Sequence, residues 1–123
     1  MNDLTAIFKE LSDGNRLRAL AALSHKCELC ACQITELLQV TSATVSRHMG
    51  ILINAELVRS RKDTRWVYYS LNIENKTLKP VLAWLQQQFA QKPEFQQDKI
   101  SLENITSCQP EELYRKQQME KNC

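Results

Sequence analysis

The sequence predicts a mainly α-helical domain that carries one small β-hairpin. Two observations predict it: apolar residues recur with helical spacing along most of the chain, and between residues 57 and 71 the spacing changes to alternation. The 123 residues, 43% hydrophobic and 24% charged, are typical of one soluble globular domain. We expect a folded domain over residues 1–92 and a polar, Gln-rich C-terminal tail over residues 93–123, loose apart from one or two short helical pieces.

The first helix is expected from the apolar stripe of Leu4, Ile7, Phe8 and Leu11, and residues 12–15 break it. Three more helices are expected at residues 16–23, 31–38 and 42–55, with a loop at residues 25–27. The residues expected to face inward from these three helices are Leu17, Leu20, Ala21, Ile34, Leu37, Leu38, Val45, Met49 and Leu52.

A turn at residues 39–41 precedes the fourth helix, and the hydroxyl of Thr41 or Ser42 is well placed to cap its first amides. The hairpin is expected as strands over residues 57–61 and 65–71 around a turn at 62–64. A last long helix is expected to start near Thr77, with Pro80 in its first turn. Its apolar stripe consists of Leu78, Val81, Leu82, Leu85 and Phe89.

Two short helices joined by a tight turn and followed by a basic hairpin have the order of a winged helix-turn-helix, whose second helix enters a major groove of DNA. The net charge of the chain is only +2, but residues 41–72 hold five basic and two acidic side chains, a local charge of +3. Small hydroxyl residues at the start of the second helix allow close approach to DNA, and Arg47 can form two hydrogen bonds to guanine or phosphate. The basic residues at the hairpin turn can meet the minor groove or the DNA backbone. The candidate DNA-binding residues are Thr41, Ser42, Ala43, Thr44, Ser46, Arg47, His48, Arg61, Lys62 and Arg65.

Three of the five cysteines, Cys27, Cys30 and Cys32, lie within six residues just before the helix-turn-helix. Neither a membrane span nor a signal peptide is expected, so we expect a reducing cytoplasmic location, where clustered thiols favour metal or redox chemistry. Thiolates prefer soft ions. Residues i and i+2 of a regular helix point roughly 200° apart. Cys30 and Cys32 can therefore share an ion only if the helix starts after Cys30 or if binding unwinds its first turn.

The run from Phe8 to Asn72 resembles the ArsR/SmtB family of metal-responsive bacterial repressors. The segments that carry the resemblance are FKELSDGNRLRALAAL, CELCACQITELL, TSATVSRHMGILINAELV and RSRKDTRWVYYSLN. The resemblance implies a homodimer through the first and last long helices, binding to double-stranded operator DNA, and release of the operator when a metal ion binds.

The resemblance also indicates which ion acts as the inducer. Zinc-sensing members bind through carboxylates and histidines of the last helix, but residues 78–92 contain no His, Asp or Glu. The arsenic-sensing motif ELCVCDL appears as residues 28–34, with Gln33 in place of its Asp and Thr35 where some members have a third cysteine. This implies trivalent arsenic, As(III), or antimony, Sb(III), as inducer at Cys30 and Cys32, and no organic cofactor.

The third sulfur ligand stays open between Cys27 and Cys108, or a two-thiol site, while Cys123 is expected to be free. Two alternatives keep the same fold: a thiol redox or persulfide sensor, and a structural zinc site of Cys27, Cys30, Cys32 and Cys108. An enzyme is the least favoured class, because with two glycines there is no Gly-rich phosphate loop, and no catalytic pair stands out.

Overall fold

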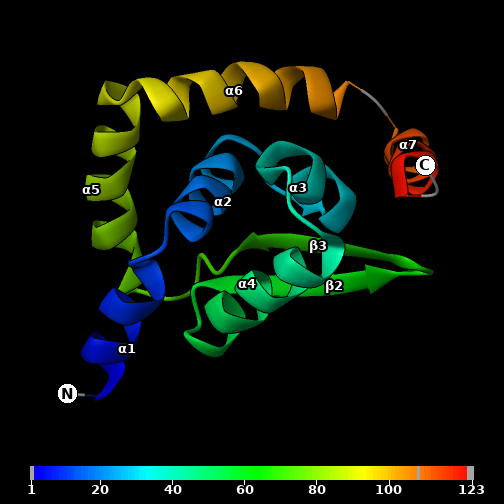
Figure 1. Cartoon of the computed structure of the whole chain (residues 1–123). Coiled ribbons are helices and arrows are strands. Elements are labelled where there is room, and N and C mark those ends of the chain that lie inside the picture. Colours follow the sequence, from blue (N-terminus) through cyan, green and yellow to red (C-terminus); the bar gives the residue numbers. More distant parts are fainter. Residues whose placement is uncertain (1, 108, 122–123) are drawn as a thin grey trace.

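The computed structural model describes residues 2–107 and 109–121, with side chains over 4–107 and 109–118. This part of the chain forms seven helices and one small sheet (Figure 1). The elements in chain order are α1 (Asn2–Leu11), α2 (Gly14–His25), β1 (Leu29–Cys30), α3 (Ala31–Leu38), α4 (Ser42–Asn54), β2 (Val58–Asp63), β3 (Trp66–Leu71), α5 (Leu78–Gln91), α6 (Pro93–Thr106) and α7 (Pro110–Lys121). Helices α2, α3 and α4 pack on the sheet. The predicted class, mainly α with a small hairpin, is confirmed.

The helix boundaries follow local capping chemistry. Asp13 caps α2 by accepting hydrogen bonds from the backbone N–H groups of Asn15 and Arg16, at 2.9 and 3.1 Å. This cap starts α2 two residues earlier than expected, and the helix ends two residues later, at His25. Thr41 is the N-cap of α4, because its hydroxyl accepts from the N–H of Thr44 at 3.2 Å.

The sheet is antiparallel with strand order β1-β3-β2, so β3 is its central strand. The hairpin turn lies at residues 64–65, not at 62–64 as expected, because β2 continues to Asp63, which pairs with Trp66. The two-residue strand β1 was not predicted. It pairs Leu29 with Tyr69 and Cys30 with Tyr68, and this pairing fixes the backbone immediately before α3.

One hydrophobic core joins α2, α3, α4 and the sheet, and Leu20, Ile34, Met49 and Leu52 are fully buried in it. The predicted inward residues of α3 and α4 are confirmed. The stripe of α1 is divided: Ile7 and Leu11 are buried, whereas Leu4 and Phe8 are exposed.

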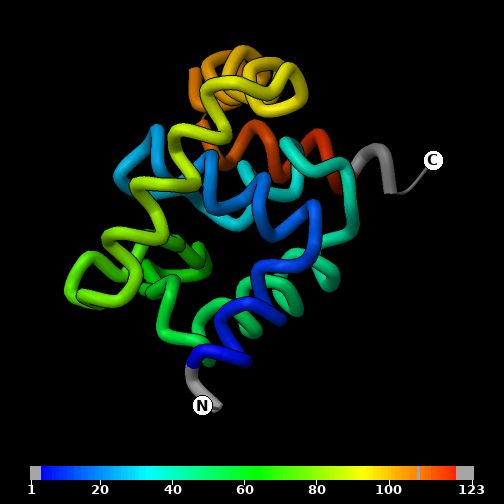
Figure 2. The backbone as a smooth tube through the Cα atoms, turned by 90° about the vertical axis from the view of Figure 1, so that its left-hand side faces the viewer, coloured from blue at the N-terminus to red at the C-terminus, as the bar shows by residue number. Residues whose placement is uncertain are grey.

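Two helices occupy the C-terminal segment, where one or two short helical pieces were expected, but its described residues are not loose. Residues 93–106 form α6, which lies over α2 and α3 as a top layer, with α1 at the opposite end (Figures 1 and 2). Arg18 fastens it, because its Nε and Nη2 donate to the Asp98 carboxylate at 2.7 and 3.0 Å while Nη2 also donates to the Leu37 carbonyl. The following helix, α7, packs against α3. None of the described helices is long and apolar enough to cross a membrane.

Candidate functional site

The first turns of α4 present a small-residue surface. Helix α3 packs on α4, and Val45 and Met49 anchor α4 in the core. Thr41, Ser42, Ala43, Ser46 and Arg47 are exposed on the opposite side. The half-buried Thr44 shares a 2.9 Å hydroxyl bond with the N-cap side chain. Exposed hydroxyls and a guanidinium at a helix N-terminus are suited to phosphates and base edges.

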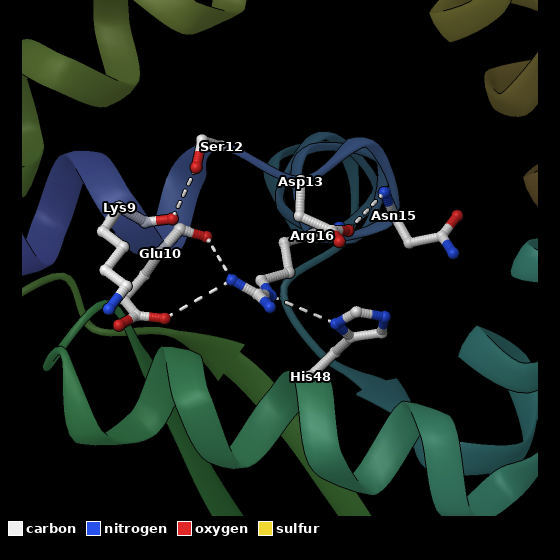
Figure 3. Close-up of polar contacts among 7 residues, drawn as sticks. All are labelled: Lys9, Glu10, Ser12, Asp13, Asn15, Arg16 and His48. Atoms are coloured by element: carbon white, nitrogen blue, oxygen red, sulfur yellow. Dashed lines mark hydrogen bonds and ion pairs between the residues drawn. The ribbon is translucent and has the colours of Figure 1, made fainter.

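His48 does not belong to this exposed surface, which corrects its assignment as a DNA-binding residue. Its side chain is only 3% exposed and points from α4 toward α2 (Figure 3), where Arg16 Nε donates to His48 Nδ1 at 3.1 Å. Arg16 Nη1 also donates to the carbonyl oxygen and to Oε2 of Glu10, at 3.1 and 3.4 Å. Arg16 therefore connects α1 to α4 through His48.

The protonation of His48 affects this connection. Burial lowers the pKa of the His48 imidazole, as do the nearby charges of Arg47 and Arg16, although Asp13 opposes them. Burial would raise the pKa of the Asp13 carboxyl, but the N–H groups of Arg16 and Asn15 and the charge of Arg16 hold it below its usual value. His48 therefore stays neutral and accepts from Arg16, because a protonated imidazole has no lone pair to offer.

We expect a pH-dependent stability from this histidine. Its pKa is depressed in the folded state, so the unfolded chain binds more protons and stability falls as pH drops below about 6.5. The other histidine, His25, also has a pKa lowered by burial, so the comparison uses a His25→Gln background. Thermal unfolding at pH 7.5 and 5.5 is expected to show a larger loss of Tm with His48 present than in the His48→Gln variant. An equal loss in both would show that His48 does not carry the effect.

The hairpin, which forms the wing, carries the three other basic candidates. Lys62 is exposed. Arg61 donates from Nε and Nη2 to the Glu28 carboxylate, both at 2.6 Å, and its guanidinium lies 4.4 Å from the centre of the Tyr68 ring. The Arg65 guanidinium lies 4.8 Å from the centre of the Trp66 ring. Each arginine thus lies against an aromatic ring. Arg61 also forms an ion pair with Glu28, which stands two positions before Cys30 in the sequence.

Cys30 and Cys32 form a buried thiol pair at the N-terminus of α3. Cys30 is its N-cap and has extended backbone angles, with φ −68° and ψ 149°. The regular helix therefore starts after Cys30, the first of the two alternatives posed by the sequence, and the two sulfurs lie 3.1 Å apart. Gln33, which replaces the family's aspartate, accepts from the N–H of Cys30 at 2.8 Å and keeps this backbone in place.

The two thiols have different acidities. The hydrogen bond donated by the Cys32 thiol lowers the pKa of Cys30 to about 7, and N–H groups at the start of α3 act in the same direction against the effect of burial. The same hydrogen bond and burial raise the pKa of Cys32. At neutral pH, Cys30 is therefore the nucleophilic sulfur of the pair.

The structure does not bring Cys27 into the pair. Cys27 is exposed, and within the described residues no three or more His, Cys, Asp or Glu side chains lie close enough to hold a metal ion. Cys108 and Cys123 lie outside the described residues. The carbonyl oxygen of Pro110, two positions after Cys108, is 3.7 Å from Cys32 Sγ.

Sequence reasoning missed the cover over the thiols. Leu113 of α7 is buried against Cys30 and Cys32, and Trp66 and Tyr68 pack beside them. A cavity of about 490 Å³ adjoins this cluster, between α3, the start of α4, the wing and α7. The sequence does contain a signal for the start of α7. Pro110 is followed by two acidic residues, and this pattern is typical of a helix N-terminus.

Comparisons with known proteins identify relatives of this chain. Residues 13–60 match the family model described as bacterial regulatory protein, arsR family. The cadmium resistance regulator CadC homolog of Staphylococcus aureus is 37% identical over 73 residues, which are 59% of this chain and 60% of that protein. The arsenical resistance operon repressor of Staphylococcus xylosus is 45% identical over 72 residues, 58% of this chain and 68% of that protein.

A solved structure supports the fold. The homodimeric winged helix-turn-helix DNA-binding domain Mb0332 from Mycobacterium bovis superposes with a TM-score of 0.61 at 22% identity, over 69% of this chain and 76% of that one. The order α3, α4, β2 and β3 is thus a winged helix-turn-helix. Together with the sequence relatives, it shows that this chain belongs to the ArsR family of bacterial regulatory proteins.

Proposed function

We propose that the chain is a homodimeric transcriptional repressor that binds operator DNA in the cytoplasm and releases it when trivalent arsenic or antimony bonds to Cys30 and Cys32. It acts as a regulator and not as an enzyme. The observation that carries this proposal is the pair of sulfurs 3.1 Å apart at the start of α3, directly before the helix that presents Arg47.

The donor set suits a soft, sulfur-seeking ion. Two thiols lie side by side in an apolar setting, without a carboxylate or imidazole grouped with them in the described residues. Trivalent arsenic and antimony form strong bonds to sulfur and need no oxygen ligand. Since α3 already begins after Cys30, unwinding of its first turn is not required to bring both sulfurs to one ion.

For the third bond of the ion, we propose Cys108 in preference to Cys27. Cys32 Sγ contacts the carbonyl oxygen of Pro110, and Cys108 stands only two positions earlier in the sequence. Cys27 is exposed and is not grouped with the other thiols. Cys108→Ser is therefore expected to weaken arsenite binding more than Cys27→Ser does.

The dimer is supported by an apolar face on α1 and α5. Phe8 and Trp84 are 66% and 59% exposed, and both line a mainly apolar groove of about 630 Å³. Monomeric proteins rarely expose a contiguous apolar surface, and a second copy of the chain would bury this one. Two copies would present two α4 helices to the two halves of an operator.

Titration of arsenite into a protein–operator complex tests the function. The operator duplex comes from the promoter of the chain's own gene, and fluorescence anisotropy follows its release. Arsenite is expected to weaken binding by roughly 5- to 150-fold, the usual range of such coupling. Antimonite should act likewise, and cadmium serves as a comparison because of the cadmium-resistance relatives. Complexes that persist under arsenite and antimonite would contradict the proposal.

The DNA contact of Arg47 gives a second prediction. Arg47→Ala is expected to cost about 1–3 kcal/mol of operator affinity without any metal, because a bidentate contact to a base is lost. Arsenite binding, followed by thiol–arsenic absorption in the ultraviolet, should remain unchanged. An operator affinity equal to that of the parent would show that Arg47 does not contribute to the contact with DNA.

A second candidate function is thiol redox or persulfide sensing on the same fold. It is favoured by the proximity of the Cys30 and Cys32 sulfurs and by the pKa of about 7 for Cys30. Peroxide or persulfide would then release the operator without any arsenic compound. The same anisotropy assay in metal-free buffer separates the two functions.

A further inference from the structure

Helix α7 contacts the thiol pair along one of its faces. Leu113 is buried against Cys30 and Cys32. Gln117 Nε2 donates to the backbone carbonyl of Cys32 at 3.0 Å, and the carbonyl of Pro110 lies 3.7 Å from Cys32 Sγ. Three positions of α7 therefore contact Cys32, the second residue of α3.

The next residue of α7 contacts the wing. The ring of Tyr114 meets the ring of Trp66 edge to face, with centres 5.7 Å apart and planes at 84°. The Arg65 guanidinium lies 5.6 Å from the centre of the Tyr114 ring and 4.8 Å from that of Trp66. Two rings thus hold the guanidinium that stands at the hairpin turn, where a wing meets DNA.

The two sets of contacts cannot change independently. Leu113 and Tyr114 are consecutive residues of one helix, so a shift that uncovers the sulfurs also moves the ring beside Arg65. The sulfurs have little free surface, since Cys30 and Cys32 are 1% and 7% exposed. The cavity of about 490 Å³ beside them is lined by Cys30 and Cys32 and also by Tyr114 and Gln117 of α7, so a ligand bonded to both sulfurs would lie against α7 and disturb its contacts.

We propose that Tyr114 is a positioning residue for Arg65, and that α7 thereby transmits the state of the thiol pair to the DNA contact of the wing. The second half of this inference rests on the proposed function. The first half, the positioning of Arg65 in the metal-free protein, does not. An Arg65 side chain that is already ordered loses less conformational entropy when it binds phosphate or a base edge.

The test is a double-mutant cycle on the full chain, read as operator affinity without metal. Tyr114→Ala is expected to weaken binding about 3- to 10-fold, the effect of losing a partly desolvated cation–ring contact. If Tyr114 acts through Arg65, the variant that carries both Tyr114→Ala and Arg65→Ala binds no worse than Arg65→Ala alone. Tyr114→Phe keeps the ring and should retain the affinity of the parent.

Arsenite then tests whether α7 transmits the state of the thiol pair to the wing. Tyr114→Ala should still bind arsenite, by ultraviolet absorption, but its arsenite-induced loss of operator affinity should be at least threefold smaller than that of the parent. Additive losses in the cycle, or a Tyr114→Ala response identical to that of the parent, would overturn the inference. If arsenite fails to release even the parent protein, the proposed function fails, while the metal-free cycle still decides whether Tyr114 positions Arg65.

Discussion

Replacing Cys32 with serine is expected to leave operator binding intact and to abolish release by arsenite. Serine keeps the size and the hydrogen-bonding capacity of the side chain at the start of α3, but its oxygen does not replace a soft sulfur ligand. The ratio of operator affinities without and with arsenite should fall from the range of roughly 5- to 150-fold to about 1. Fluorescence anisotropy of the labelled operator, at fixed salt concentration, measures this ratio.

The matched control is Cys27→Ser, because Cys27 is an exposed thiol only three positions before Cys30 and outside the buried pair. This variant should respond to arsenite like the parent. Release of Cys32→Ser by arsenite at the parental concentration would show that the pair does not sense arsenic. Loss of response in Cys27→Ser would instead return Cys27 to the ligand set.

Phe8→Glu is expected to convert the protein to a monomer and to lower operator affinity on the order of 100-fold or more, because a monomer engages one half-site only. The side chain of Phe8 is exposed on α1 beside the groove that Trp84 also lines. A carboxylate at this position would have to leave water for a mainly apolar groove between two copies, which costs more than the lost apolar contact. Sedimentation velocity measures the mass, and anisotropy measures the affinity.

Ile100→Glu provides the control for this surface. Ile100 is an equally exposed apolar residue, but it lies on α6, away from the groove between α1 and α5. It should leave both the dimer and the operator affinity unchanged. A Phe8→Glu protein that stays dimeric would place the dimer interface elsewhere.

The sequence was most informative where structure is decided by neighbours along the chain. The bounds of α3 follow from helical periodicity, and capping chemistry placed the N-cap of α4 at Thr41 or Ser42, of which the structure has Thr41. The Cys-x-Cys spacing likewise identified the thiol pair and the two backbone conformations that allow it to share an ion. The structure selects one of them, because pairing of Cys30 with Tyr68 in β1 holds the residue before the helix extended.

His48 shows a signal that was present but misread. Val45, His48, Met49 and Leu52 stand at positions i, i+3, i+4 and i+7 of α4, and all four are buried. The polar imidazole suggested a surface role, whereas the spacing indicates the buried face. Arg16 compensates for the burial by its hydrogen bond, and this partner is 32 residues away in the sequence.

The order of α7 depends on tertiary contacts that its own sequence does not reveal. Its segment is rich in polar residues, and Leu113 is the one of its described side chains that is buried. Its place on the thiol pair rests on packing against Cys30 and Cys32 and on the ring contact with Trp66. Helix periodicity gives little warning of contacts between residues some 80 positions apart.

X-ray absorption at the arsenic edge of the arsenite-loaded protein tests most directly whether the thiol pair is the sensor. We predict a first shell around arsenic that contains at least two sulfur atoms in the parent protein, and loss of this shell in the Cys30→Ser/Cys32→Ser variant. An arsenic atom surrounded by oxygen alone in the parent, or an unchanged sulfur shell in the double variant, would contradict the account.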